Sequence, residues 1–129
     1  MEPTWVPKSA VRAIHAELIR EHGGLHGVSR EGALEAALAR PRHVYTYAEP
    51  APSLASLAAS YGFALAKGHW FGDGNKRIAL AIIDVFLRLN GSELNAGEAD
   101  AATTILALAA GEISESELGD WISAHYRAA

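Results

Sequence analysis

Hydrophobic residues recur every three or four positions along most of this chain, and short polar or glycine-containing segments separate the repeats. This spacing places apolar side chains on one face of a helix. The pattern predicts helices over residues 8–22, 53–67 and 75–89, and a short one that follows Ser29 and is stopped by Pro41. Two more are expected after pairs with capping-box spacing, Asn95 with Glu98 and Ser114 with Glu117. An all-α fold in one domain, residues 1–129, is therefore predicted.

Residues with known capping preferences mark the expected helix ends. Gly23-Gly24 supplies the left-handed conformation that ends the first helix, and Asn90-Gly91 closes the fourth. Ser53 suits the N-cap of the third helix, and Pro41 is expected to stop the second. The four boundaries therefore rest on backbone chemistry as well as on hydrophobic spacing.

The stretch from Asn75 to Leu89 has scarcely any polar face. Its few charges include Asp84 and Arg88, four residues apart in the order that favours an ion pair. A helix that is apolar nearly all round belongs in the interior. We therefore expect a helical bundle around this central buried helix.

Residues 42–50 break the helical pattern. Val44, Tyr45, Thr46 and Tyr47 are β-branched or aromatic and lie between two prolines. Such residues favour extended backbone. The sequence predicts a short extended flap or hairpin here.

Composition narrows the possible functions. Half of the 129 residues are hydrophobic and 20% are charged, as in ordinary globular proteins. The absence of cysteine excludes a disulfide framework, a thiol nucleophile and a cysteine zinc site. A net charge of −4 argues against direct nucleic-acid binding. No secretory signal or run of ~18 apolar residues is seen, so we expect a cytoplasmic protein without a membrane span.

The segment before the 75–89 helix carries the candidate chemistry. A helix N-terminus attracts anions through unpaired N–H groups and the helix dipole. Gly72 and Gly74 let the backbone pass close to a ligand, and Lys76 and Arg77 add cationic donors for phosphate. The run therefore predicts a nucleotide-phosphate site.

Two further residues of this run suit phosphate transfer. Asp73 would repel phosphates unless Mg²⁺ lies between them, held by the carboxylate and the phosphate oxygens. His69 lies four positions earlier, and a neutral imidazole can accept a proton from an attacking hydroxyl. Asp73 could also be only an N-cap, and the tyrosines of the flap could simply pack against the core.

The run His69-Trp70-Phe71-Gly72-Asp73-Gly74-Asn75-Lys76-Arg77 resembles the signature of the Fic/Doc (Fido) family. The wider chain is similar to its Doc (death-on-curing) branch, at Gly23-Gly24, at Leu34–Leu38 before Pro41, and at Phe86-Leu87 with Asn90-Gly91. The resemblance implies a Fido-type helical bundle. The resemblance implies that His69 is the general base, that Asp73 binds Mg²⁺, and that Asn75 and Arg77 hold the phosphates of ATP. It also implies that the Val44–Tyr47 flap docks the target by strand addition.

Lys76 distinguishes the possible reactions within this family. Members that transfer AMP have glycine there, whereas the Doc branch has lysine and resembles a protein kinase that delivers the γ-phosphate to a threonine of elongation factor Tu. Such proteins are toxins held inactive by an antitoxin. The self-inhibitory helix of some Fic proteins is absent, which favours inhibition by a separate antitoxin protein. Two alternatives stay open: nucleotidyl transfer despite Lys76, and a binding module without catalysis.

Overall fold

The structure is a computed structural model that describes residues 2–24, 31–68 and 75–129. The described elements are, in chain order, α1 (Lys8–His22), α2 (Glu31–Tyr47), α3 (Leu54–Lys67), α4 (Asn75–Leu89), β1 (Ser92–Leu94), α5 (Glu98–Ala109), α6 (Glu115–Ala124) and β2 (Tyr126–Ala128). The all-α prediction is confirmed, with one small antiparallel strand pair added. None of the helices that the structure describes has the length and hydrophobicity of a membrane-spanning segment.

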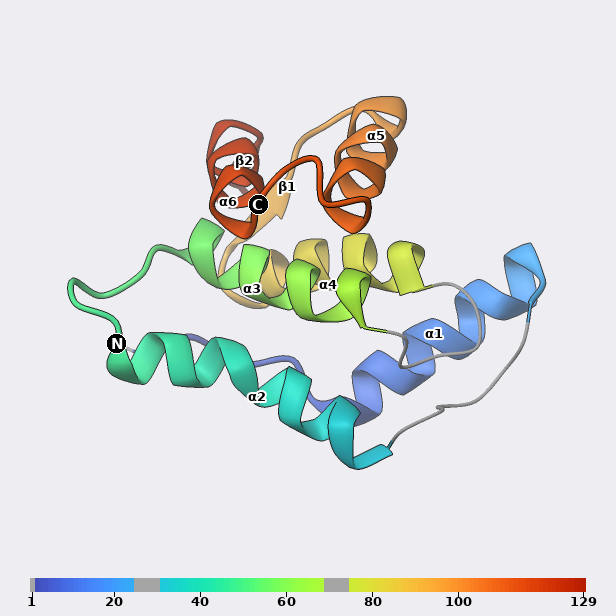
Figure 1. The fold of residues 1–129 in the computed structure, drawn as a ribbon, viewed down its shortest axis with the longest axis horizontal. Helices are drawn as coiled ribbons and strands as arrows, with labels where there is room; N and C mark the ends of the chain where they lie inside the picture. The colour runs from blue at the N-terminus through green and yellow to red at the C-terminus, as the bar shows by residue number, and fades with distance from the viewer. Residues whose placement is uncertain (1, 25–30, 69–74) are drawn as a thin grey trace.

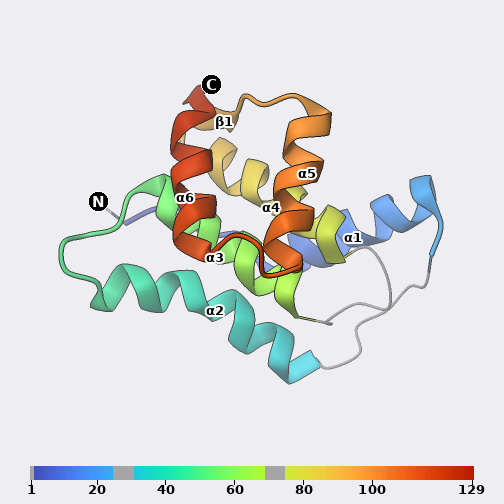
Figure 2. The ribbon, with the colours of Figure 1, turned by 45° about the horizontal axis from the view of Figure 1, so that its top comes forward.

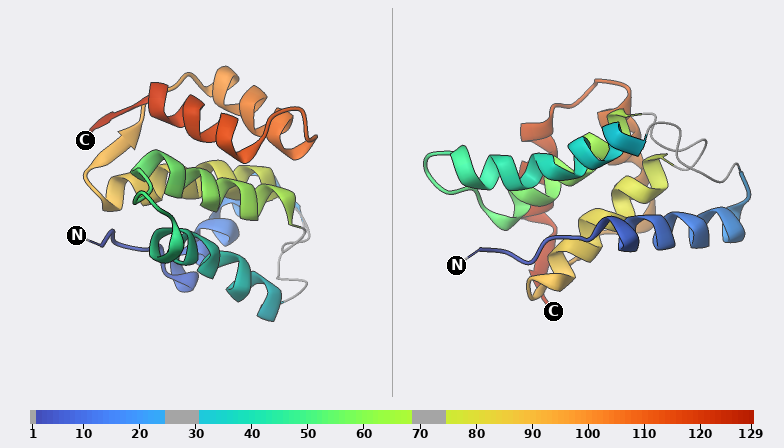
Figure 3. Two further views of the ribbon diagram at one scale, coloured as in Figure 1. Left: turned by 60° about the vertical axis from the view of Figure 1, so that its left-hand side comes forward. Right: turned by 90° about the horizontal axis from the view of Figure 1, so that it is seen from below.

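The helices form three layers (Figures 1 and 3). α3 and α4 make the middle layer, α1 and α2 lie on one side of it, and α5 and α6 lie side by side on the other, as Figure 2 also shows. α3 packs against α2, α4, α5 and α6. The core is therefore built around the α3–α4 pair.

α3 is the more enclosed helix of this pair. Ten of its 14 residues are buried, because many of them are alanines that let neighbouring helices approach. Gly62 marks the closest approach: a Cβ built there would lie 2.6 Å from Cδ1 of Ile83 on α4. The expectation that the 75–89 helix is the one buried all round is thus only partly right.

α4 has one broad buried face and one solvent stripe. The buried face is completely enclosed and contains large apolar side chains: Ile78, Ile82, Ile83, Phe86 and Leu87. The stripe runs through Arg77, Asp84 and Arg88, and Asp84 pairs with Arg88 at 2.8 Å as predicted. These charges, at helical spacing, keep that side of α4 in water.

Several predicted caps are confirmed. Ser53 accepts a hydrogen bond from the Ser56 N–H, and Ser114 forms a complete capping box with Glu117. Gly23 and Gly91, which follow α1 and α4, have positive φ values of 78° and 86°, which residues with a Cβ rarely adopt.

The expected capping box at Asn95 is wrong. Asn95 instead lies next to a strand pair that was not predicted. Gly97 is the N-cap of α5, while the Asn95 N–H donates to the His125 carbonyl, 2.5 Å away. Beside this bond, β1 and β2 pair antiparallel with Glu93 opposite Arg127. Each strand has three residues, too few for hydrophobic alternation to reveal it.

The predicted extended flap is also wrong in this structure. Val44, Tyr45, Thr46 and Tyr47 form the last turn of α2, and Pro41 lies inside that helix. The Thr46 hydroxyl donates to the Arg42 carbonyl at 2.9 Å, and the Ala48 N–H donates to the Val44 carbonyl at 3.0 Å. Pro41 is buried, and Val44 and Tyr45 pack against the core. These tertiary contacts outweigh the local preference for extended backbone.

Candidate functional site

The described part of the predicted phosphate site is the first turn of α4. Asn75 is the first residue of the helix, and the side chains of Lys76 and Arg77 are exposed. Ile78 and Ala79, directly after them, are completely buried. Buried residues therefore hold α4 in the core, while the side chains of Lys76 and Arg77 in its first turn face solvent.

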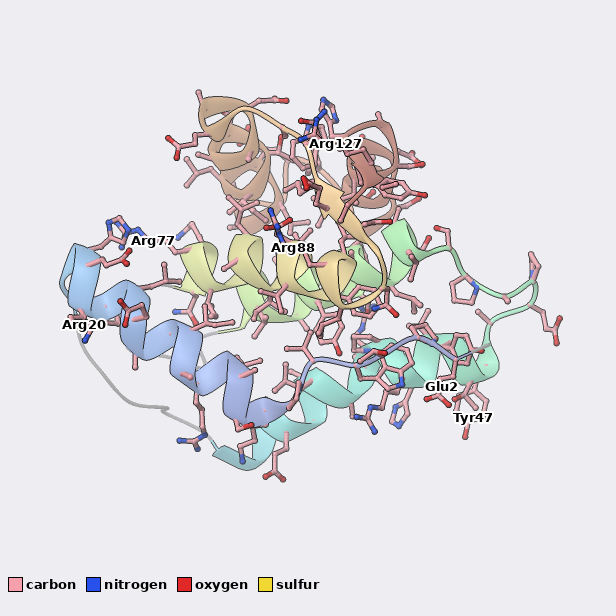
Figure 4. All side chains as sticks on the ribbon, turned by 180° about the vertical axis from the view of Figure 1, so that it is seen from behind. Glu2, Arg20, Tyr47, Arg77, Arg88 and Arg127 are labelled. Carbon is pink, nitrogen blue, oxygen red and sulfur yellow. The ribbon has the colours of Figure 1, made fainter. Side chains whose placement is uncertain are left out.

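This turn lies where several helix ends meet. α3 ends and α4 begins at the same end of the molecule, where α1 ends and α2 begins (Figures 1 and 3). Figure 4 shows Arg77 at this end, beside the last turn of α1 that carries Arg20. The segment of the signature that precedes α4 thus joins two helices packed in the middle layer.

The electrostatics of the first turn favour an anion. The turn contains no acidic residue, although Asp and Glu are the side chains that the helix dipole stabilises there. Lys76 and Arg77 form no ion pair with any other residue that the structure describes. Two cations beside the positive end of a dipole gain most from a phosphate group.

The opposite end of α4 is fixed by its polar residues. Asn90 accepts a hydrogen bond from the Thr4 N–H at 2.8 Å and donates to the carbonyls of Thr4 and Phe86, both at 2.9 Å. Asp84 accepts from the Leu94 N–H at 2.9 Å. Its hydrogen bond to Arg88 also raises the pKa of that guanidinium.

A buried tyrosine connects the same region to the N-terminus. The Tyr61 hydroxyl on α3 accepts a hydrogen bond from the Val6 N–H at 3.0 Å, and the Tyr61 ring lies 5.1 Å from that of Phe86. Burial raises the pKa of Tyr61 above its ordinary value. The N-terminal strap, residues 2–7, is therefore fastened to both helices of the middle layer.

Four predicted site residues lie outside the described part of the chain: His69, Gly72, Asp73 and Gly74. Their roles as base, metal ligand and ligand-approach glycines stay predictions. Among the described ranges, no group of three or more His, Asp or Glu is arranged to hold a metal. The structure thus places Asn75, Lys76 and Arg77 together on one turn.

The residues predicted as a flap lie away from this turn. Val44 lines a groove together with Ser53 and Ser56, at the beginning of α3, whereas the signature follows the end of α3. A 14-residue helix is about 20 Å long. Figure 4 likewise shows Tyr47 and Arg77 at opposite ends of the molecule. The structure therefore does not bring Val44–Tyr47 to the predicted phosphate site.

The sequence analysis missed the residues that hold the layers together. Arg40 on α2 binds both carboxylate oxygens of Glu115 on α6, at 2.6 and 2.7 Å, and also donates to the Ser60 hydroxyl. Asn90 was recognised only as a helix stop. Nothing in local spacing pairs residues 75 or 86 positions apart, so no sequence signal was available for either contact.

Comparison with known proteins agrees with the signature. Residues 5–87 match the Fic/DOC family. The chain is 38% identical over 117 residues to "Protein kinase doc" of Escherichia phage P1, covering 91% of each protein. It is 40% identical over 74 residues, 57% of each chain, to "Toxin Doc" of Mycolicibacterium smegmatis. This chain belongs to the Fic/DOC family, on its Doc branch.

Proposed function

We propose that this protein is a Doc-type toxin that acts as a protein kinase, transferring the γ-phosphate of ATP to a serine or threonine hydroxyl of a translation factor resembling elongation factor Tu. The observation that carries the proposal is the exposed first turn of α4, where Lys76 and Arg77 face solvent beside the positive end of the helix dipole. The phage relative is itself named a protein kinase.

Lys76 favours kinase chemistry over AMP transfer. Its side chain adds bulk and charge at the position where AMP-transferring members of the family have glycine. An ammonium group is a compact point charge that suits a terminal phosphate, while the fork of Arg77 suits two oxygens. With both cations on one turn, the triphosphate is held by its terminal groups.

The reaction assigns a task to the polar residues of the signature. The target hydroxyl oxygen forms a bond to the γ-phosphorus, the bond from that phosphorus to the β–γ bridging oxygen breaks, and ADP leaves. His69 accepts the hydroxyl proton. Lys76, Arg77 and Asn75 bind and orient the phosphates, which supplies most of the catalysis in this reaction class.

The donor chemistry of the signature fits a magnesium ion. Asp73 offers one hard carboxylate oxygen, and Mg²⁺ typically takes one or two carboxylates together with substrate phosphates. When bound, the ion neutralises phosphate charge. Asp73 is the residue that would hold it.

The name of the mycobacterial relative supports the toxin part of the proposal. A toxin that modifies a translation factor acts in the cytoplasm and needs a partner that silences it. We assign that task to a cognate antitoxin protein.

The test incubates the purified protein with bacterial lysate and ATP labelled at either the α- or the γ-phosphate. We expect protein labelling from the γ-position only, abolished by His69→Ala and retained by His43→Ala, which changes an exposed histidine on α2. Labelling from the α-position would contradict the kinase proposal and indicate a nucleotidyl transferase. No label at either position, with folded and antitoxin-free protein, would indicate a binding module.

A further inference from the structure

The α5–α6 layer differs in charge from the rest of the molecule. Residues 91–129 contain seven carboxylates and one arginine, a net charge of −6, whereas residues 1–90 carry +2. Four of the carboxylates are on α6 or directly before it: Glu112, Glu115, Glu117 and Asp120. This outer layer therefore carries the net negative charge of the protein.

A groove of about 780 Å³ lies on this layer, between α6, the beginning of α3 and the connection from α2. Its volume is within the range of established ligand sites. One wall is apolar and includes Val44, Ala48, Pro50 and Pro52. The facing wall is the polar side of α6.

The polar wall has a carboxylate group and hydroxyl groups that a ligand could contact. Glu115 lines the groove, but its two oxygens are bound by Arg40. Asp120 also lines it, is exposed, and forms no ion pair within the described ranges. Ser116 and Ser123 add hydroxyl groups, and no lysine or arginine lines the groove.

We propose that this groove docks a basic, extended segment of a partner protein. Lysine and arginine side chains combine an apolar stem with a charged head. In the groove, the stem lies along the proline and alanine wall while the head reaches Asp120. The hydroxyl groups of α6 pair with main-chain groups of the segment. Charge complementarity with the whole α5–α6 layer excludes an acidic segment or a nucleic acid.

This docking surface is separate from the proposed phosphate site. The groove includes the first turn of α3, and the signature follows its last turn, about 20 Å away. The proposal goes beyond phosphate transfer and does not depend on it. Either can fail without the other, because peptide binding is measured without ATP.

The test measures binding of a fluorescent peptide with alternating alanine and arginine, three of each, by fluorescence anisotropy. We expect saturable binding that weakens with added salt, and none for the same peptide with glutamate in place of arginine. Asp120→Lys should weaken binding by about fivefold to tenfold. Its matched control, Glu98→Lys, adds the same charge on α5 outside the groove and should change affinity less than twofold.

Amide chemical shifts of the unaltered protein locate the bound peptide independently of any variant. Changes confined to Val44–Ser56 and to α6 support the docking groove. The proposal is overturned if the shifts move mainly at the first turn of α4, if the two lysine variants weaken binding equally, or if no peptide binds. Equal affinity for spermidine, which carries the same charge without a peptide backbone, also overturns it.

Discussion

The two ends of α4 use polar residues in opposite ways. At the C-terminal end, Asp84, Arg88 and Asn90 all have protein partners, and each bond connects α4 to itself or to a neighbouring segment. At the N-terminal end, Lys76 and Arg77 face solvent and oppose the helix dipole. The first set stabilises the fold, whereas the second is the set that we propose to bind phosphate. The following predictions test this division, beginning with the largest effect.

Charge reversal at Lys76 should separate activity from stability. We expect Lys76→Glu to lower phosphate transfer by at least about a hundredfold, because a carboxylate repels the triphosphate. The same change should raise the free energy of unfolding by about 0.3–1 kcal/mol, since a negative charge in the first turn is favoured by the dipole. Labelling assays and urea denaturation measure the two quantities.

Arg88→Glu is the matched reversal at the other end of the helix. It removes the ion pair with Asp84 and places a negative charge near the negative end of the dipole. Activity should stay within twofold of the unaltered protein, while the urea midpoint of unfolding falls slightly, since an exposed ion pair contributes little to stability. If Lys76→Glu and Arg88→Glu lose the same activity, the two ends of α4 do not differ in function as proposed.

Gly62→Ala tests the close packing of α3 against the middle of α4, between its two ends. The new methyl group would meet Ile83 and Leu118, both completely buried, so one of these side chains must shift. We expect a loss of about 1–3 kcal/mol in the free energy of unfolding. Gly32→Ala, at an exposed helical glycine with open space around it, should be neutral or stabilising.

Asn90→Ala should release the N-terminal strap from α4. The substitution removes an acceptor and two donated hydrogen bonds. A stability loss of about 1–2 kcal/mol is expected, with protease cleavage near residue 4 as a second readout. If stability is unchanged, the C-terminal end of α4 does not depend on this contact.

Alkaline pH should weaken the attachment at Tyr61. Because burial raises the pKa of this hydroxyl, the unfolded chain loses the proton first as the pH rises above about 10. Stability from this group is therefore present below that pH and is lost as the pH rises toward the pKa of the folded protein. Between pH 9 and 11, the unaltered protein should lose more stability than Tyr61→Phe. Parallel curves would refute this.

The sequence predicted the helices well because hydrophobic spacing and caps such as Ser53 and Ser114 are local signals. It failed at Val44–Tyr47, where the local preference for extended backbone is real but packing of Val44 and Tyr45 against the core is stronger. It also missed β1 and β2, whose pairing joins segments more than thirty residues apart.

In the candidate site too, local features were predictable from the sequence and long-range packing was not. Asn75, Lys76 and Arg77 are neighbours in sequence, so their common turn was predictable from the helix start alone. The placement of the supposed flap depended on how α2 packs along α3, which no local pattern contains. The family was recognised because its signature is contiguous, from His69 to Arg77.

The most direct test of the division within α4 is titration calorimetry of Mg²⁺·ATP with the unaltered protein, Arg77→Ala and Arg88→Ala. Both arginines are exposed and lie on the same helix, Arg77 in its first turn and Arg88, which pairs with Asp84, in its last turn. We predict that Arg77→Ala weakens ATP binding at least tenfold and that Arg88→Ala changes it less than twofold. Equal affinity of the two variants would contradict a phosphate site at the N-terminal end of α4.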